Sequence, residues 1–166
     1  MRADMDALAG AWEVEGFLAD SVVVADGKLY VQGAGWNVIY TQALPMRHPR
    51  VGIGLVVRVA YTATNQVHNF TVRLEDQDGT EIGLAQPPPD TEAPDGPVTR
   101  IQGQFNIGRP PFLRPGDEQL IPFAINFDGL EFERADRYSF VIEVDGEEAK
   151  RLPFRVELHP GAGVPR

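Results

Sequence analysis

The dipeptide Asp26-Gly27 constrains this chain more than any other feature of its sequence. It lies between two runs of strand-forming residues, SVVVA at 21–25 and KLYVQ at 28–32. Two-residue hairpin loops need positive φ angles, which Asp and Gly tolerate, so the dipeptide predicts a β-hairpin with a fixed register. Alternation of side chains then divides the apolar residues between two faces, the first of which we expect to form core. The first face holds Val22, Val24, Leu29 and Val31, and the second holds Val23 and Tyr30.

The rest of the chain continues this pattern of short strands separated by turns. Apolar and polar residues alternate in several stretches, as in strands with one buried face. Two further stretches are apolar on both faces, and in the first of them Gly52 and Gly54 leave room for close packing. Residues 44–50 contain two prolines and predict a connection. The stretches apolar on both faces are 51–60 and 120–127, and the alternating ones are 67–75, 98–108, 137–144 and 151–158.

These features predict an all-β fold, an antiparallel two-sheet sandwich of about eight strands with Greek-key, immunoglobulin-like or jelly-roll-like topology. We expect residues 14–158 to form this domain, preceded by an N-terminal arm at 1–13 and followed by a C-terminal tail at 159–166. Tyr138 enters a strand from a tight corner. This position is typical of the tyrosine corner of Greek-key sandwiches, in which the phenol bonds to upstream backbone.

The composition of the chain limits the compartments in which it is expected and the kinds of partner that it is expected to bind. The 166 residues include no cysteine, which excludes disulfides, cysteine-ligated metals and thiol catalysis. No apolar run near the N-terminus is long enough for a signal or membrane-spanning segment, so we expect a cytoplasmic protein. The net charge of −9 argues against binding to nucleic acid or to an anionic membrane. We also expect no cofactor, because no phosphate-binding or dinucleotide-binding glycine motif is present.

Three segments combine turns and core positions in one arrangement: ADSVVVADGKLYVQGAGW at 19–36, VRLEDQDG at 72–79 and RYSFVIEVDGEEAKRLPFRV at 137–156. In these segments the chain resembles an uncharacterised family of bacterial, mostly actinobacterial, β-sandwich proteins. The resemblance covers residues 17–158. It implies a β-sandwich, and it brings no known activity and no known functional residue to this chain.

Residues for nucleophilic or metal chemistry are scarce. The two serines, Ser21 and Ser139, do not lie in a Gly-x-Ser-x-Gly elbow. The three histidines, His48, His68 and His159, have no metal-binding spacing. His68 alternates with apolar residues, so we expect a neutral, hydrogen-bonded ring in the core.

Carboxylates gather in several of the expected turns, for example at 75–78, 90–95 and 145–148. Loops at one end of a sandwich can converge on calcium, which takes roughly six to eight oxygen ligands. Aspartates in turns also bond to their own backbone, and glutamates on strand faces are solvated. The second description is our leading interpretation, and a calcium or small-ligand site is the alternative.

The N-terminal arm and one loop carry the apolar residues that we expect to make protein contacts. Residues 1–13 contain an apolar stripe at helical spacing, which predicts a short helix. The loop at 109–118 carries two large apolar residues where polar ones are usual. The candidate interaction residues are Met5, Leu8, Trp12, Phe112 and Leu113.

We therefore expect a non-enzymatic cytoplasmic protein that acts by contact, either with itself in a homo-oligomer or with another protein subunit as a scaffold. The alternatives are a small-ligand or calcium-binding module, and an enzyme whose site the sequence does not reveal. A ligand that binds only the folded chain would raise its melting temperature, which separates these classes.

Overall fold

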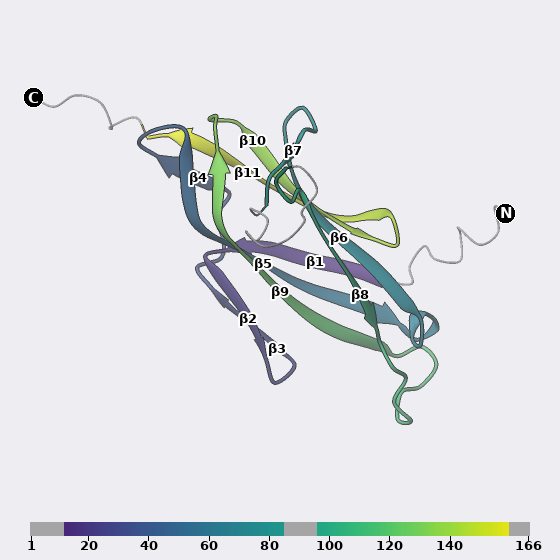
Figure 1. Cartoon of the computed structure of the whole chain (residues 1–166). Coiled ribbons are helices and arrows are strands. Elements are labelled where there is room, and N and C mark those ends of the chain that lie inside the picture. The colour runs from purple at the N-terminus through teal and green to yellow at the C-terminus, as the bar shows by residue number, and fades with distance from the viewer. Residues whose placement is uncertain (1–11, 85–95, 160–166) are drawn as a thin grey trace, which may run out of the picture.

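The computed structural model describes residues 12–84 and 96–159, and the described chain is all-β (Figure 1). It contains eleven strands and one short 3-10 turn, η1, at Tyr61–Ala63. The all-β class is therefore confirmed. The strands are β1 (Trp12–Ala19), β2 (Ser21–Ala25), β3 (Lys28–Gln32), β4 (Val38–Thr41), β5 (Met46–Ala60), β6 (Val67–Asp76), β7 (Glu81–Ile82), β8 (Arg100–Asn106), β9 (Glu118–Phe132), β10 (Arg137–Val144) and β11 (Glu147–Leu158).

The strands form three sheets. A three-stranded sheet has the order β1-β5-β9, and a six-stranded sheet has the order β4-β11-β10-β6-β7, with β8 also paired to β6. The third sheet is the two-stranded hairpin β2-β3. All pairs are antiparallel except β4 with β11, which is parallel. The expected arrangement of about eight antiparallel strands in two sheets is corrected accordingly, because the hairpin does not join either large sheet.

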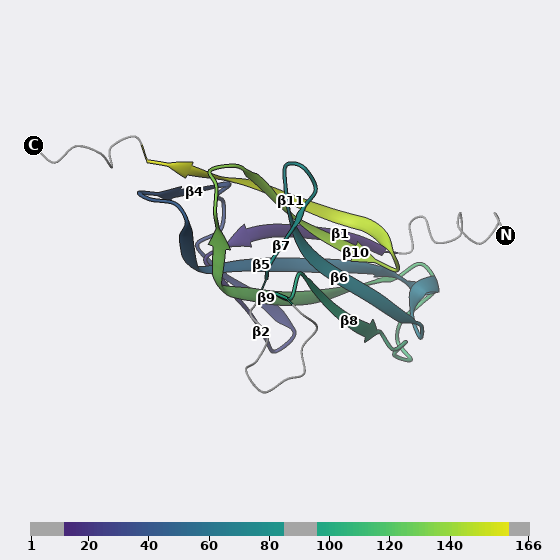
Figure 2. The ribbon, with the colours of Figure 1, turned by 45° about the horizontal axis from the view of Figure 1, so that its top comes forward.

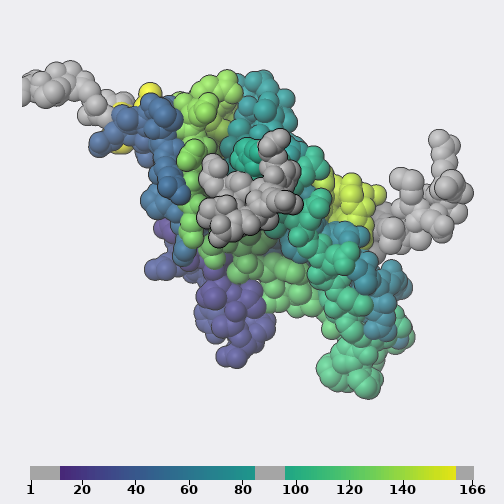
Figure 3. Space-filling view, in the orientation of Figure 1, coloured from purple at the N-terminus to yellow at the C-terminus, as the bar shows by residue number. Residues whose placement is uncertain are grey.

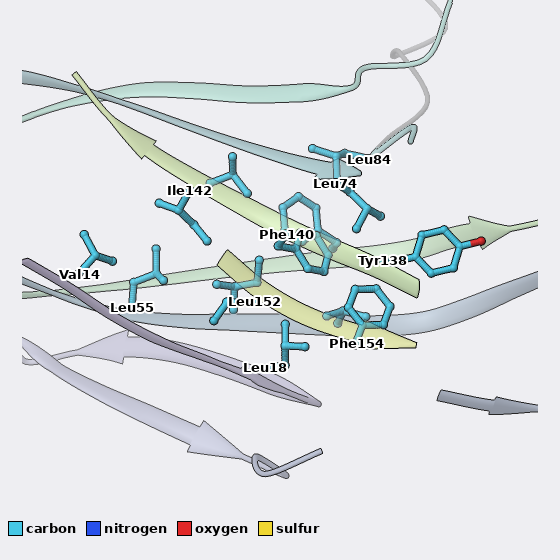
Figure 4. Packing of buried hydrophobic residues seen from close by; sticks show 14 of the residues in the cluster. Val14, Leu18, Leu55, Leu74, Leu84, Tyr138, Phe140, Ile142, Leu152 and Phe154 are labelled. Carbon is cyan, nitrogen blue, oxygen red and sulfur yellow. The ribbon is translucent and has the colours of Figure 1, made fainter. Parts of the chain in front are cut away.

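The core lies between the two larger sheets (Figures 2 and 4). Buried residues from β1 and β5, such as Val14 and Leu55, meet buried residues from β10 and β11. Phe140 and Phe154 from the six-stranded sheet stack with ring centroids 5.7 Å apart. Strands β5 and β9 pair along their whole length, from Met46 opposite Phe132 to Ala60 opposite Glu118.

Strand β5 begins earlier than the sequence indicates. Residues 46–50, which we expected to form a connection, continue the strand. Pro49 cannot donate a ladder hydrogen bond, and the paired register has no partner for it between His48 and Arg50. Pro49 is therefore tolerated within β5, although the sequence pattern predicts that this strand begins only at residue 51.

The tyrosine corner is confirmed. Tyr138 is buried at the start of β10, and its hydroxyl donates a hydrogen bond of 2.8 Å to the carbonyl oxygen of Arg134. Its ring packs edge-on against Phe132, with centroids 4.9 Å apart. The contact fixes the corner between β9 and β10, and with it the path of the chain between the two larger sheets.

The prediction of an N-terminal helix is wrong for residues 12 and 13, the part of the arm that the structure describes. Trp12 begins β1 and pairs with Val59, ahead of the expected domain boundary at residue 14. The sequence WEVEGFLA alternates in exposure, with Val14 and Leu18 buried, and this period of two prevails over the helical spacing. Met1, Met5 and Leu8 lie outside the described residues.

A candidate protein-contact surface

The hairpin β2-β3 has the loop and register that the sequence predicts. Asp26 and Gly27 have φ angles of 49° and 69°. Ala25 pairs with Lys28, and the pairing continues to Ser21 opposite Gln32. Both loop residues lie in the left-handed region that the favoured two-residue hairpin turn requires.

The hairpin packs on the outer face of the three-stranded sheet, away from β10 and β11 (Figure 2). Two glycines of β5 permit this close approach. A Cβ atom added to Gly52 would lie 3.2 Å from Ser21 Cα, and one added to Gly54 would lie 3.2 Å from Leu29 Cδ2. The expectation that these glycines leave room for close packing is therefore confirmed.

Asn126 of β9 attaches the hairpin to the same face. The N–H of Val22 donates to Asn126 Oδ1 at 3.0 Å, and Asn126 Nδ2 donates to the carbonyl oxygen of Val22 at 2.8 Å. One amide side chain thus satisfies both backbone polar groups of Val22. Val22 itself is buried, so this end of the hairpin is fixed.

Most of the hairpin's apolar side chains are exposed, so the expectation that one face is core is only partly right. Val22 is buried and Leu29 is half-buried, but Val24 and Val31 on the same face are 38% and 39% exposed. The side chains on the opposite face are exposed further, and Figure 3 shows the hairpin standing out from the body of the molecule. We define the hairpin surface as Val23, Val24, Tyr30 and Val31, with Val23 55% and Tyr30 51% exposed.

The hairpin surface is electrically neutral on an acidic protein. Residues 21–32 carry one negative and one positive side chain, Asp26 and Lys28, both next to or in the loop. The whole chain has a net charge of −9. Two molecules of this protein repel each other over much of their surface, and the hairpin is a region where that repulsion is absent.

Three of the predicted contact residues, Trp12, Phe112 and Leu113, are in the described part of the chain and lie at one end of the three-stranded sheet. Trp12 pairs with Val59 at the start of β1 and is partly buried against the core. The loop with Phe112 and Leu113 precedes β9, whose first residues pair with the same end of β5. Phe112 is 81% exposed, whereas Leu113 is half-buried. The structure thus brings Trp12 and this loop to the same end of the sheet.

The histidines and carboxylates of the described part of the chain were candidates for a metal site in the sequence. No group of three or more His, Asp or Glu side chains there could hold a metal ion. His68 is buried, with hydrogen-bond acceptors at both ring nitrogens. The ring is hydrogen-bonded in the core as expected, but two acceptors favour its charged form over the expected neutral one.

A groove of about 650 Å³ runs between the turn after β6 and the ends of β5 and β9. Its lining mixes arginines with carboxylates, and the most buried carboxylate is already bonded. Asp76 Oδ1 accepts from the N–H groups of Asp78 at 3.0 Å and Thr80 at 2.9 Å, while Oδ2 lies 3.3 Å from Arg134 Nη2. The carboxylate therefore holds its own turn, as the leading interpretation of the turn aspartates predicts.

Sequence reasoning missed the hairpin surface as a candidate site. The signal was present in the sequence, because both faces of the hairpin are apolar although a two-stranded sheet has only one face to pack. Val23 and Tyr30, assigned to the face away from the core, are the two most exposed residues of the surface.

Comparisons with known proteins give a family and no activity. The chain matches DUF6941, described as a family of unknown function, over residues 16–157. A search of curated proteins found no match. Among solved structures, the chain is similar to the Pseudomonas fluorescens alkylpurine DNA glycosylase AlkC bound to DNA containing an abasic site analog, at 12% identity and a TM-score of 0.43. That match covers 89% of this chain and 30% of the glycosylase. Among the described residues, no helix has the length and apolar character to cross a membrane.

Proposed function

This chain belongs to DUF6941, a family of unknown function, and we propose that it is a non-enzymatic cytoplasmic protein that works by self-association. The contact is made by the hairpin surface. The observation that carries this proposal is the exposure of four apolar side chains on one uncharged part of a hairpin. Single exposed apolar residues are normal on protein surfaces, but a group of them on one element is typical of an interaction site.

The size of the surface predicts a concentration-dependent oligomer. Full burial of a Val-sized side chain contributes about 1.5–3 kcal/mol, and the four residues are already partly covered. Association itself costs on the order of 4–15 kcal/mol in lost freedom. The net free energy of association is therefore small, so we expect monomers at low protein concentration and oligomers at high protein concentration.

The charge distribution favours a second copy with its own neutral hairpin as the partner. A basic partner would be attracted to the acidic remainder of the chain, whereas the hairpin offers it no charge to recognise. A second copy meets the hairpin without a charge mismatch, and only the remaining acidic surfaces repel. Salt screens that repulsion, so self-association strengthens as the ionic strength rises.

Sedimentation equilibrium over a range of protein concentrations tests this proposal. The variant pair Val23→Asp and Tyr30→Asp charges the exposed face of the hairpin without touching the core. The matched control is Val67→Asp with Phe112→Asp, because these residues are at least as exposed and lie away from the hairpin. We expect the wild type and the control to associate and the hairpin variant to remain monomeric.

Two results would contradict the proposal. A wild type that stays monomeric at every concentration excludes self-association. If the control variant loses association and the hairpin variant keeps it, the contact must lie at the end of the sheet with Phe112 and Trp12. Melting curves of all variants confirm that each keeps its fold.

A further inference from the structure

We infer that two copies join through the free edge of β3, so that Lys28–Gln32 of one copy pairs antiparallel with Lys28–Gln32 of the other. The two hairpins then form one four-stranded sheet in the order β2-β3-β3-β2. This inference rests on the proposed self-association and specifies how it is achieved.

The register of the hairpin determines which backbone groups point outward. The two-residue loop makes Ala25 and Lys28 a hydrogen-bonded pair, and such pairs alternate along an antiparallel ladder. The peptide groups of the intervening residues therefore point away from the hairpin. These residues are Val22 and Val24 on β2, and Leu29 and Val31 on β3.

The two edges of the hairpin differ in whether they are occupied. On β2, the outward N–H and C=O groups of Val22 are taken by the side chain of Asn126. On β3, no strand in the described part of the chain other than β2 pairs with Lys28–Gln32. In the described part of the chain, both outward residues of β3, Leu29 and Val31, are therefore open, whereas on β2 Asn126 leaves only Val24 open.

The β3 edge also lacks the features that normally prevent edges from pairing. Natural edge strands carry charges, prolines or bulges. Strand β3 has one charge, Lys28, at its first position, no proline, and an unbroken register with β2. The edge strand β9, in contrast, carries Glu118, Pro122 and Asp128.

A two-fold axis through Tyr30 gives a register without conflicts. Leu29 of each copy lies opposite Val31 of the other, and these residues exchange backbone hydrogen bonds through their outward groups. Lys28 lies opposite Gln32 of the other copy, so no like charges face each other. Tyr30 lies opposite Tyr30 of the other copy at a non-hydrogen-bonded position, where side chains approach most closely.

Disulfide cross-linking tests this register without background, because the chain has no cysteine. In a non-hydrogen-bonded pair the Cα atoms are about 4.5 Å apart, within reach of a disulfide, so Tyr30→Cys should oxidise to a linked dimer. The matched control is Val23→Cys, on the same face and similarly exposed. Its two copies would be separated by three strand spacings, roughly 14 Å, and should not link.

Proline substitution tests the edge itself. Val31→Pro removes an outward N–H of β3, while Val24→Pro removes an outward N–H of β2 and serves as the control. Neither change removes a hydrogen bond within the hairpin. We expect Val31→Pro to weaken dimerisation at least tenfold in sedimentation and Val24→Pro to leave it close to the wild type. If either proline variant loses its fold, the comparison of Tyr30→Cys with Val23→Cys still tests whether the two copies pair through β3.

The outcomes separate this inference from the proposed function. A wild type that does not self-associate overturns both. A wild type that dimerises, with Val31→Pro dimerising equally well or Tyr30→Cys failing to link, overturns the edge pairing and leaves self-association in place. Linking of Val23→Cys as fast as Tyr30→Cys also overturns the edge pairing, because it requires a different register or face.

Discussion

His68 Nδ1 lies 2.7 Å from Asp145 Oδ2 and ties the start of β6 to the turn between β10 and β11. The other ring nitrogen, Nε2, lies 2.9 Å from the carbonyl oxygen of Ala63. Burial lowers the pKa of His68, but the hydrogen bonds to Ala63 and Asp145 and the charge of Asp145 outweigh it, and the pKa lies above its ordinary value. The His68 ring therefore connects η1, β6 and the β10-β11 turn, and the hydrogen bonds at both of its nitrogens favour its charged form.

This raised pKa predicts a pH dependence of stability. The charged His68 stabilises the fold fully below the unfolded pKa of about 6.5, and this contribution is lost as the pH rises through the higher folded pKa. His48 acts in the opposite direction, because burial lowers its pKa. We expect the difference in unfolding free energy between the wild type and His68→Gln to shrink from pH 5.5 to pH 8.5, measured by urea titration. A constant difference would show that His68 does not carry the charge, and His48→Gln serves as the control.

Gly27→Ala should destabilise the protein by about 1 kcal/mol, because an L-residue with a side chain is strained in the left-handed region. The added Cβ has open space, so the cost arises from the φ of 69° and not from a clash. Gly108→Ala is the control, since its Cβ also meets nothing within 4 Å and its φ is not left-handed. Equal urea midpoints for the two variants would contradict the strain assigned to the turn.

Tyr138→Phe should cost about 0.5–1.5 kcal/mol, the typical net contribution of one hydrogen bond. The ring keeps its contacts with Phe132, so only the hydroxyl bond to Arg134 is lost. Tyr40→Phe is the control because Tyr40 is exposed. If both variants unfolded at the urea concentration of the wild type, the corner would not depend on this bond.

Asn126→Ala should loosen the hairpin while the rest of the fold remains. It removes two hydrogen bonds to Val22, which together contribute about 1–3 kcal/mol. Limited proteolysis is the appropriate measurement, with new cleavage expected between residues 20 and 33 and no change elsewhere. Asn106→Ala, at an exposed position on β8, is the control. An unchanged cleavage pattern would mean that the hairpin is held by packing on Gly52 and Gly54 alone.

The features that the sequence predicts well are those set by local chemistry. The register from Ala25 opposite Lys28 follows from the two loop residues between them, and the Tyr138 corner follows from a short local motif. The parallel pairing of β4 with β11 joins segments far apart in the chain, and no local signal marks it. The position of the hairpin on the three-stranded sheet also depends on residues far away in the chain. Alternation separates the two faces of the hairpin, but it does not show which of them another sheet covers.

The structure shows which of the predicted contact residues are exposed and which are packed on the core. Phe112 is exposed as a contact residue should be, whereas Trp12 belongs to β1 and packs on the core. Spacing alone could not distinguish a helical stripe from the start of a strand over so few residues. A truncation that tests the arm should therefore begin at Trp12, because one that begins at Val14 also removes the first residues of β1.

Hydrogen exchange of the hairpin amides, followed by NMR at increasing protein concentration, tests the central claim most directly. The amides of Leu29 and Val31 point out of the free edge of β3, so self-association through this edge should slow their exchange as the concentration rises. The outward amide of Val24 on β2 should exchange at the same rate throughout and serves as the internal control. Exchange of Leu29 and Val31 that is fast and independent of concentration, in a sample that sedimentation shows to be oligomeric, would contradict the account.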